Sequence, residues 1–150
     1  MGADDLTFYE RLRIQMEYVV PLVRDLQRQL GEEAVNEALA SRLEQQVERR
    51  AAPGSKADFS RMRAGTEMFA AGGALELRAV SESDDHFSMD VVDCAYTRMM
   101  DELDARDLGP MLICNLDYPD AARMGMQLER TQTRMQGASH CDFRYSRRPD

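Results

Sequence analysis

The first part of the chain repeats its apolar residues with the period of an α-helix. Between residues 6 and 30, large apolar side chains recur at steps of three and four, which is typical of a helix with one buried face. Thr7 and Glu10 have the spacing of a capping box at its start, and Gly31 is a stop signal. Pro21 interrupts this pattern and predicts a kink or a division into two helices.

Two further helices are predicted before the pattern changes. From Glu32 to Arg50 apolar residues recur every fourth position, and the other faces carry Glu, Gln and Arg. An Ala-Ala-Pro-Gly-Ser sequence after Arg50 predicts a break in the chain. A short helix is then expected to start with Asp58 or Ser60 as its cap, to run through Met68 and to end at Gly72-Gly73.

The second half of the chain has the period of two that is typical of strands. The acidic stretch 83–85 reads as a hairpin turn between two alternating segments, and Gly137-Ala138 as a turn between two later ones. A helix is expected over 95–105, whereas the apolar run 111–114 is too short to classify by period. The pattern predicts strands over 75–79, 87–91, 126–135 and 141–146.

Length and composition predict one folded domain. The chain has 150 residues, 43 % of them apolar, which is enough for a single core. We therefore expect one α+β domain over 1–150, in which N-terminal helices (6–70) pack on a small antiparallel sheet (74–147). The net charge of −8 argues against a nucleic-acid partner. No apolar run approaches the roughly 20 residues that cross a bilayer, so no membrane partner is expected.

Cysteine usage predicts a compartment. Cys94, Cys114 and Cys141 are odd in number and stand far apart, unlike a disulfide framework. The N-terminus also lacks the basic-then-apolar pattern of a secretory signal. These features predict reduced thiols in a cytoplasmic protein.

The last third of the chain concentrates reactive side chains. His140 and Cys141 follow a glycine turn and begin a predicted strand, and a cysteine nucleophile needs a base or a cation beside it. Neighbours on a strand point to opposite faces, so Asp117 or His86 could supply the base instead. Burial as a small core residue is the competing interpretation of each cysteine.

Arginines and metals provide two more possibilities. Arg130, Arg134 and Arg144 fall on the two terminal predicted strands, where a guanidinium can bind a carboxylate through two hydrogen bonds. Pairing with acidic side chains on the surface is the alternative. Three thiolates and an imidazole could also form a tetrahedral zinc shell, although the sequence has no Cys-x-x-Cys.

Residues 130–145 resemble the C-terminal signature of the L-2-amino-thiazoline-4-carboxylic acid hydrolase family. They read Arg-Thr-Gln-Thr-Arg-Met-Gln-Gly-Ala-Ser-His-Cys-Asp-Phe-Arg-Tyr, and the family pairs an Arg-Thr-x-Thr strand and a Gly turn with a Cys-Asp-Phe-Arg strand. Cys94-Ala95-Tyr96 is similar to the family's Cys-Pro-Tyr element, with alanine in place of proline. Residues 109–117 are similar to its Cys-x-x-Asp segment. The resemblance covers about residues 90–146.

This resemblance implies a hydrolase that opens a small cyclic amidine, amide or imide at a carbon–nitrogen bond. The ring would be thiazoline- or hydantoin-like and carry a carboxylate, and no cofactor is expected. Cys141 would be the nucleophile, with His140 or Asp117 as general base. The expected substrate-binding residues are Asn115, Arg130, Arg144, Cys114 and Cys94.

The alternative is a module that binds a small ligand and either has no catalytic activity or depends on a metal ion. In the first form, the helix Glu32–Arg50 would pair with a second copy and give a homo-oligomer. In the second, Cys94, Cys114 and Cys141 would be metal ligands.

Overall fold

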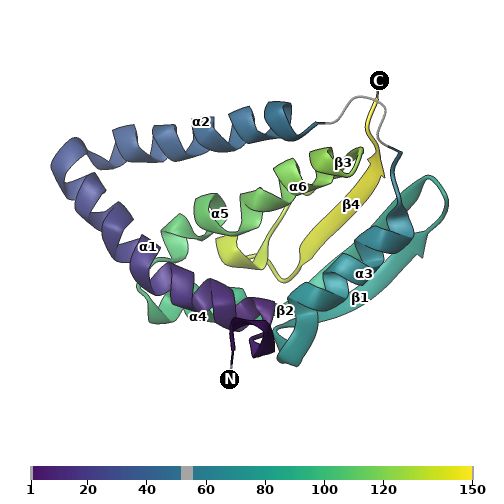
Figure 1. Ribbon diagram of the computed structural model, residues 1–150, viewed down its shortest axis with the longest axis horizontal. Coiled ribbons are helices and arrows are strands. Elements are labelled where there is room, and N and C mark those ends of the chain that lie inside the picture. Colours follow the sequence, from purple (N-terminus) through teal and green to yellow (C-terminus); the bar gives the residue numbers. More distant parts are fainter. Residues whose placement is uncertain (1, 52–55, 150) are drawn as a thin grey trace.

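A computed structural model describes residues 2–51 and 56–149. The predicted fold class is confirmed, because helices pack on a four-stranded antiparallel sheet (Figure 1). The predicted break after Arg50 falls mainly on residues 52–55, which lie outside the described residues. No helix in the described part of the chain is both long and apolar enough to cross a membrane.

Helix α1 (Phe8–Leu30) begins with the predicted capping box. Thr7 Oγ1 accepts a hydrogen bond from the Glu10 backbone N–H at 3.2 Å, and the Glu10 carboxylate accepts one from the Thr7 N–H at 2.7 Å. Pro21 lies inside this single helix, so a division into two helices is wrong. The residues around Pro21 remain helical because Met16, Val20 and Val23 are buried on the opposite face.

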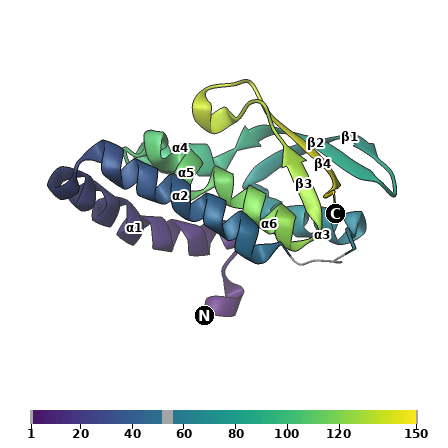
Figure 2. The same ribbon diagram turned by 90° about the horizontal axis from the view of Figure 1, so that it is seen from above.

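Helix α2 (Glu32–Arg50) has the predicted bounds; it diverges from α1 after their connection (Figure 1) and runs alongside α5 and α6 (Figure 2). Gly31 separates the two helices with φ of 94°, a conformation that favours glycine. Helix α3 (Phe59–Ala70) is capped by Asp58, whose carboxylate accepts from the Arg61 backbone N–H at 3.1 Å. Of the two predicted caps, Asp58 is therefore the right one.

The sheet has the strand order β1-β2-β4-β3, and every neighbouring pair is antiparallel. The strands are β1 (Leu75–Glu82), β2 (His86–Cys94), β3 (Met126–Glu129) and β4 (Cys141–Arg147). The last strand along the chain thus lies between β2 and β3, and the predicted hairpin turn at 83–85 joins β1 to β2.

Strand β3 is shorter than the predicted 126–135. It ends at Glu129, and Arg134–Gln136 form a 3-10 turn instead. The Thr133 hydroxyl caps this turn by accepting from the Gln136 backbone N–H at 3.1 Å, which competes with strand pairing. Arg130 and Arg134 therefore do not share a strand face.

Three short helices connect β2 to β3. The predicted helix over 95–105 is α4 (Ala95–Glu102), which ends before the left-handed residue Asp104. The unclassified run at 111–114 falls in α5 (Gly109–Leu112) and the turn after it. Helix α6 (Asp117–Arg123) was not predicted.

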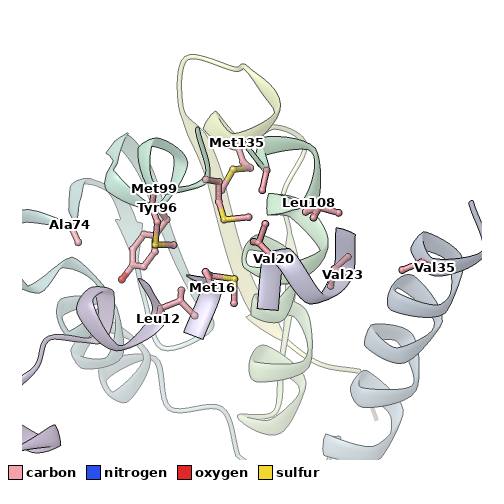
Figure 3. Close-up of a cluster of buried hydrophobic side chains, with 12 residues drawn as sticks. Leu12, Met16, Val20, Val23, Val35, Ala74, Tyr96, Met99, Leu108 and Met135 are labelled. Atoms are coloured by element: carbon pink, nitrogen blue, oxygen red, sulfur yellow. The ribbon is translucent and has the colours of Figure 1, made fainter. Parts of the chain in front are cut away.

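The buried side chains form two clusters. One joins α1 and α4 to the segment before β4, and Met135 from that segment lies among Val20, Leu108 and their neighbours (Figure 3). The other joins the inner face of the sheet to α3 and α6. Cys94 packs against both clusters, and Cys141 belongs to the second.

Candidate active site

Arg130 follows β3 directly and lies at the centre of the candidate site. Only 2 % of its side chain is exposed. Its Nη1 donates to Asp117 Oδ2 at 2.8 Å, and its Nη2 donates to the Cys114 carbonyl at 3.0 Å and to Asn115 Oδ1 at 3.2 Å. A single guanidinium therefore ties the end of β3 to the start of α6.

Two aromatic rings flank the same guanidinium. Its central carbon lies 5.3 Å from the centre of the Tyr118 ring and 5.0 Å from that of Phe143. These distances suit cation–π attraction, which is strongest where water is excluded. The rings and hydrogen bonds together fix the orientation of Arg130.

The Asp117 carboxyl group is largely buried but still reaches solvent. Burial raises the pKa of its carboxyl group to about 6, because the nearby charge of Arg130 offsets only part of the desolvation. Even so, 30 % of its side chain remains exposed. A carboxylate with a pKa near neutrality and with access to solvent is suited to exchange protons with a bound molecule.

The predicted cysteines lie near this ion pair. Burial raises the pKa of the Cys114 thiol to about 12, and that of Cys141 is raised by burial as well. For both thiols, the positive charge of Arg130 lowers the pKa. The negative charges of Asp117 and of the Cys94 thiolate raise it. Cys94 and Cys114 are half-buried, whereas Cys141 is 7 % exposed.

Cys141 receives a hydrogen bond from the backbone. Its Sγ accepts from the Arg134 N–H at 3.2 Å, which lowers the pKa of the thiol. Arg134 opens the 3-10 turn Arg134–Gln136, and Gly137 closes it with φ of 95°. A backbone donor held by such a turn stabilises a thiolate and does not depend on a side-chain rotamer.

Asp142 holds the segment that carries this donor. Its Oδ1 accepts from the backbone N–H groups of Thr131 and Gln132, both at 2.9 Å, and its Oδ2 accepts from the Thr131 hydroxyl at 2.5 Å. No sequence pattern assigned a role to Asp142. The available signal was its position next to Cys141 in a turn-rich segment with free backbone donors.

The His140 ring makes its polar contacts with Ser139 and Gln132. Its Nδ1 lies 2.9 Å from Ser139 Oγ, and its Nε2 lies 3.4 Å from Gln132 Nε2. It also lies near Asp90, whose pKa is lowered mainly by hydrogen bonds from Arg78 and Arg144.

Arg144 lies on the other side of β4 from Cys141. Its Nη2 donates to Asp90 Oδ1 at 2.9 Å and its Nη1 to the Met89 carbonyl at 3.0 Å. The structure thus separates the predicted site residues into two groups. His140 and Arg144 lie with Asp90, and the others gather around Arg130: Cys94, Cys114, Asn115, Asp117 and Cys141.

A pocket of about 350 Å³ adjoins this group. It lies between α2 and α6, and Asn115 and Tyr118 line it as well as contacting Arg130. On the α2 side it is lined by Leu43 and Val47. The apolar positions of α2 therefore face the chain's own α6, and the pairing of this helix with a second copy stays a prediction.

The three cysteines are not arranged as metal ligands. Within residues 2–51 and 56–149, no three His, Cys, Asp or Glu side chains are grouped in a way that could hold a metal ion. The geometry therefore gives no support to the metal-dependent alternative.

Comparison with known proteins identifies one family. A family model described as L-2-amino-thiazoline-4-carboxylic acid hydrolase matches residues 11–145. No curated protein matches the chain. Among solved structures, the chain is similar to the phenol-responsive sensory domain of the transcription activator PoxR with phenol. The two share 15 % identity with a TM-score of 0.46, over 85 % of this chain and 71 % of that one.

Proposed function

The chain belongs to the L-2-amino-thiazoline-4-carboxylic acid hydrolase family, and from this premise we propose that Cys141 opens a carboxylate-bearing ring by nucleophilic attack. The family's hydrolysis of a cyclic amidine sets the reaction class. We propose a thiazoline- or hydantoin-like ring as the substrate. The observation that carries the proposal is the buried Arg130–Asp117 pair, whose charges act on the Cys141 thiol.

We assign the general base to Asp117. With a pKa of about 6 its carboxyl group is largely ionised at neutral pH and can accept the thiol proton. The alternative base, His140, has its ring nitrogens directed at Ser139 and Gln132. Arg130 holds Asp117 in place, and its positive charge favours the thiolate that results.

The reaction then proceeds in two halves. The Cys141 sulfur bonds to the amidine carbon, and collapse of the tetrahedral intermediate opens the ring as Asp117 returns its proton to the leaving ring atom. Water next adds to the same carbon and expels the thiol, so one water is consumed for each ring opened. The Asn115 amide N–H groups donate to the charge that develops, since its Oδ1 already accepts from Arg130.

The half-buried thiols of Cys94 and Cys114 complete the surroundings of the ring. Arg130 acts on the substrate carboxylate through its charge, because its hydrogen bonds are taken by Asp117, Asn115 and a carbonyl group. Arg144 is bound to Asp90 on the other face of β4, and we therefore leave it out of the substrate site.

The direct test is turnover of a panel of 2-aminothiazoline-4-carboxylates and hydantoins by the purified protein. We expect Cys141→Ala and Cys141→Ser to lose at least 1,000-fold in kcat/KM, on the order of the effect of removing a covalent nucleophile. Ser146→Ala, on the same strand as Cys141 but bonded to Gln127, is the control and should retain most of the activity. Full activity in Cys141→Ala would exclude the nucleophile, and binding without turnover in the wild type would support the alternative of a ligand-binding module.

We also propose a cytoplasmic location. All three cysteines are free thiols in the structure, and reduced thiols are typical of that compartment. Fractionation of cells that produce the tagged protein tests this, and recovery outside the cytoplasm would contradict it.

A further inference from the structure

The first turn of helix α4 lies inside the protein and carries backbone donors without an acceptor. Tyr96 and Thr97, its second and third residues, are 5 % and 6 % exposed. The Ala95 N–H donates to the Ala74 carbonyl at 2.8 Å, but the N–H groups of Tyr96 and Thr97 have no partner within residues 2–51 and 56–149. The first N–H groups of a helix need acceptors from outside it, and a helix start buried without them is unusual.

A buried hydroxyl group faces the same helix end. Thr97 Oγ1 is buried and has no hydrogen-bond partner in the described part of the chain. Side chains on a helix lean toward its N-terminus, so this hydroxyl lies over the first turn, beside the N–H groups of Tyr96 and Thr97. An unpaired buried polar group costs free energy, and its presence in a folded protein needs a reason.

The start of α4 adjoins the thiols of the candidate site. Cys94 is the last residue of β2 and the cap residue of α4, and it packs against both buried clusters. Cys141 pairs with Val91 on the same strand, and three strand residues span about 10 Å. The negative charge of a Cys94 thiolate raises the pKa of Cys141, in agreement with this proximity. One small molecule can therefore reach Cys141 and the start of α4 together.

We propose that the N-terminus of α4 binds the carboxylate group of the ring substrate through the N–H groups of Tyr96 and Thr97 and through the Thr97 hydroxyl. This inference rests on the proposed function, which places the ring at Cys141. A helix N-terminus carries partial positive charge and unpaired N–H groups, and both favour an anion. The two N–H groups and the hydroxyl supply three donors to the two oxygens of a carboxylate.

The substrate carboxylate needs hydrogen bonds that Arg130 does not offer. The two Nη atoms of Arg130 already donate to three oxygen atoms of the protein. The acidic side chain just before α4, Asp93, is paired with Arg98 at 2.7 Å, which offsets its repulsion of an anion. Arg130 therefore supplies charge and α4 supplies hydrogen bonds, and together they favour a ring with a carboxylate over a neutral ring.

The first turn of α4 is fixed before a ligand binds. The Tyr96 hydroxyl donates to the Phe69 carbonyl at 2.9 Å, and Tyr96 and Met99 belong to the buried cluster shown in Figure 3. Met99 and Met100 hold the next turn of the helix with no exposed surface. A site that is already ordered loses little conformational entropy on binding.

Thiazole-4-carboxylate is a suitable probe, because it has a five-membered ring and a carboxylate but an aromatic ring that is not hydrolysed. We expect it to bind the wild type in isothermal titration calorimetry, and the neutral thiazole-4-carboxamide to bind about tenfold more weakly or worse. Thr97→Val keeps the shape of the side chain and should weaken binding of the carboxylate about 10–100-fold, the effect of one hydrogen bond to a charged group. Thr97→Ser should keep most of the affinity.

Thr66→Val is the matched control. Thr66 is also a buried threonine on a helix, but its hydroxyl donates to the Arg63 carbonyl at 2.7 Å. This variant should bind thiazole-4-carboxylate as the wild type does. Unchanged affinity in Thr97→Val, or equal affinity of the wild type for the carboxylate and the carboxamide, would overturn the proposal.

Stability separates a binding role of Thr97 from a structural one. Without the probe, Thr97→Val should unfold at the same urea concentration as the wild type or at a higher one, because its hydroxyl has no bond to lose among the described residues. A marked loss of stability in the free protein would show that the hydroxyl serves the fold, and would contradict a role in binding.

Nuclear magnetic resonance locates the probe even if a variant fails to fold. Thiazole-4-carboxylate should shift the amide resonances of Tyr96 and Thr97, whereas the amide of Arg61, which already donates to Asp58 at 3.1 Å, should not move. The same shifts in Cys141→Ala would support the carboxylate site whether or not Cys141 is the nucleophile, so the two proposals can fail separately. Shifts confined to other residues, or no binding at millimolar concentration, would exclude this site.

Discussion

The backbone N–H of Arg134 donates a hydrogen bond to Cys141 Sγ at 3.2 Å. Arg134 is the first residue of the 3-10 turn Arg134–Gln136, and Cys141 is the first residue of β4. The hydrogen bond therefore joins the starts of these two elements. Because the donor is a backbone group, most substitutions of Arg134 leave it unchanged. Proline is the exception, and it offers a direct test of what the bond does.

Arg134→Pro should raise the pKa of the Cys141 thiol by about one unit, since the thiolate loses a hydrogen bond worth about 1.5 kcal/mol. Proline fits the first position of a helical turn, and Thr133, with φ of −138° and ψ of 149°, already has the extended backbone that precedes proline. Alkylation of Cys141 across a range of pH, followed by mass spectrometry, measures the change. Arg134→Ala keeps the N–H and should behave as the wild type; equal shifts in both variants would show that the bond has no effect on the thiol.

Activity should rise with pH through an apparent pKa near 6. Asp117 has a folded pKa of about 6 against an ordinary value of 3.8, so only above about pH 6 is it mainly the ionised base. The same shift makes the folded protein bind more protons than the unfolded chain between those values. The contribution of Asp117 to stability therefore falls as pH rises from about 4 to 6. Asp117→Asn should abolish both effects, whereas Asp101→Asn, on an exposed ion pair, should preserve the pH profile of kcat/KM.

Removing the buried arginine should be costly. Arg130→Met leaves the Asp117 carboxylate and the Cys114 carbonyl without their donor, and we expect a loss of about 3–5 kcal/mol in the free energy of unfolding. Urea denaturation measures this loss. Arg106→Met breaks an ion pair with Asp101 that is about half exposed on both sides, and little change is expected. Similar midpoints for the two variants would contradict the structural role of Arg130.

Gly109 has no room for a side chain. A Cβ there would come within 2.6 Å of Met135 Cγ, and Met135 lies in the turn that carries the Arg134 donor. Gly109→Ala should therefore cost about 1–3 kcal/mol by overpacking. The loss should be partly reversed in the double variant Gly109→Ala with Met135→Ala. Gly65→Ala on α3 is the control, because nothing lies within 4 Å of the Cβ that it adds. This substitution should leave stability unchanged or improve it.

Asp142 allows a graded experiment. Asp142→Asn retains an oxygen that can accept from the backbone N–H groups of Thr131 and Gln132, so it should keep most of the activity. Asp142→Ala loses all three bonds and should lower kcat/KM by about tenfold or more, through displacement of the segment that carries Arg134. Comparable activity in the alanine and asparagine variants would mean that the segment is held by other contacts.

Local signals in the sequence were sufficient for most of the fold. The capping box at Thr7 and Glu10 and the glycine at 31 set the ends of α1 because caps act within a few residues. The hairpin of β1 and β2 followed from strict alternation around an acidic turn. Helix α6 was missed, since it is only seven residues long and too short for a helical period to emerge.

The site was harder to predict because its contacts are tertiary. The alternation of side chains along a strand indicated that His140 need not touch Cys141, but it could not show which polar groups surround the thiol. Arg130 meets Asp117 only because α6 packs against β3, and neither the length of β3 nor the existence of α6 was available from the sequence pattern. The turn at Arg134–Gln136 depends on the Thr133 cap, which competes with an otherwise plausible strand.

The position of β4 in the sheet has a consequence for biosynthesis. Strand β4 is synthesised after the other three strands of the sheet, yet both β2 and β3 pair with it, so until residue 147 has been synthesised β3 has no neighbour in the sheet and β2 is paired with β1 alone. Pairings between segments this distant in sequence form slowly, and uncovered apolar strands are prone to aggregate in the meantime. The strand that begins with Cys141 is therefore the one that completes the sheet, and folding of the sheet waits for it.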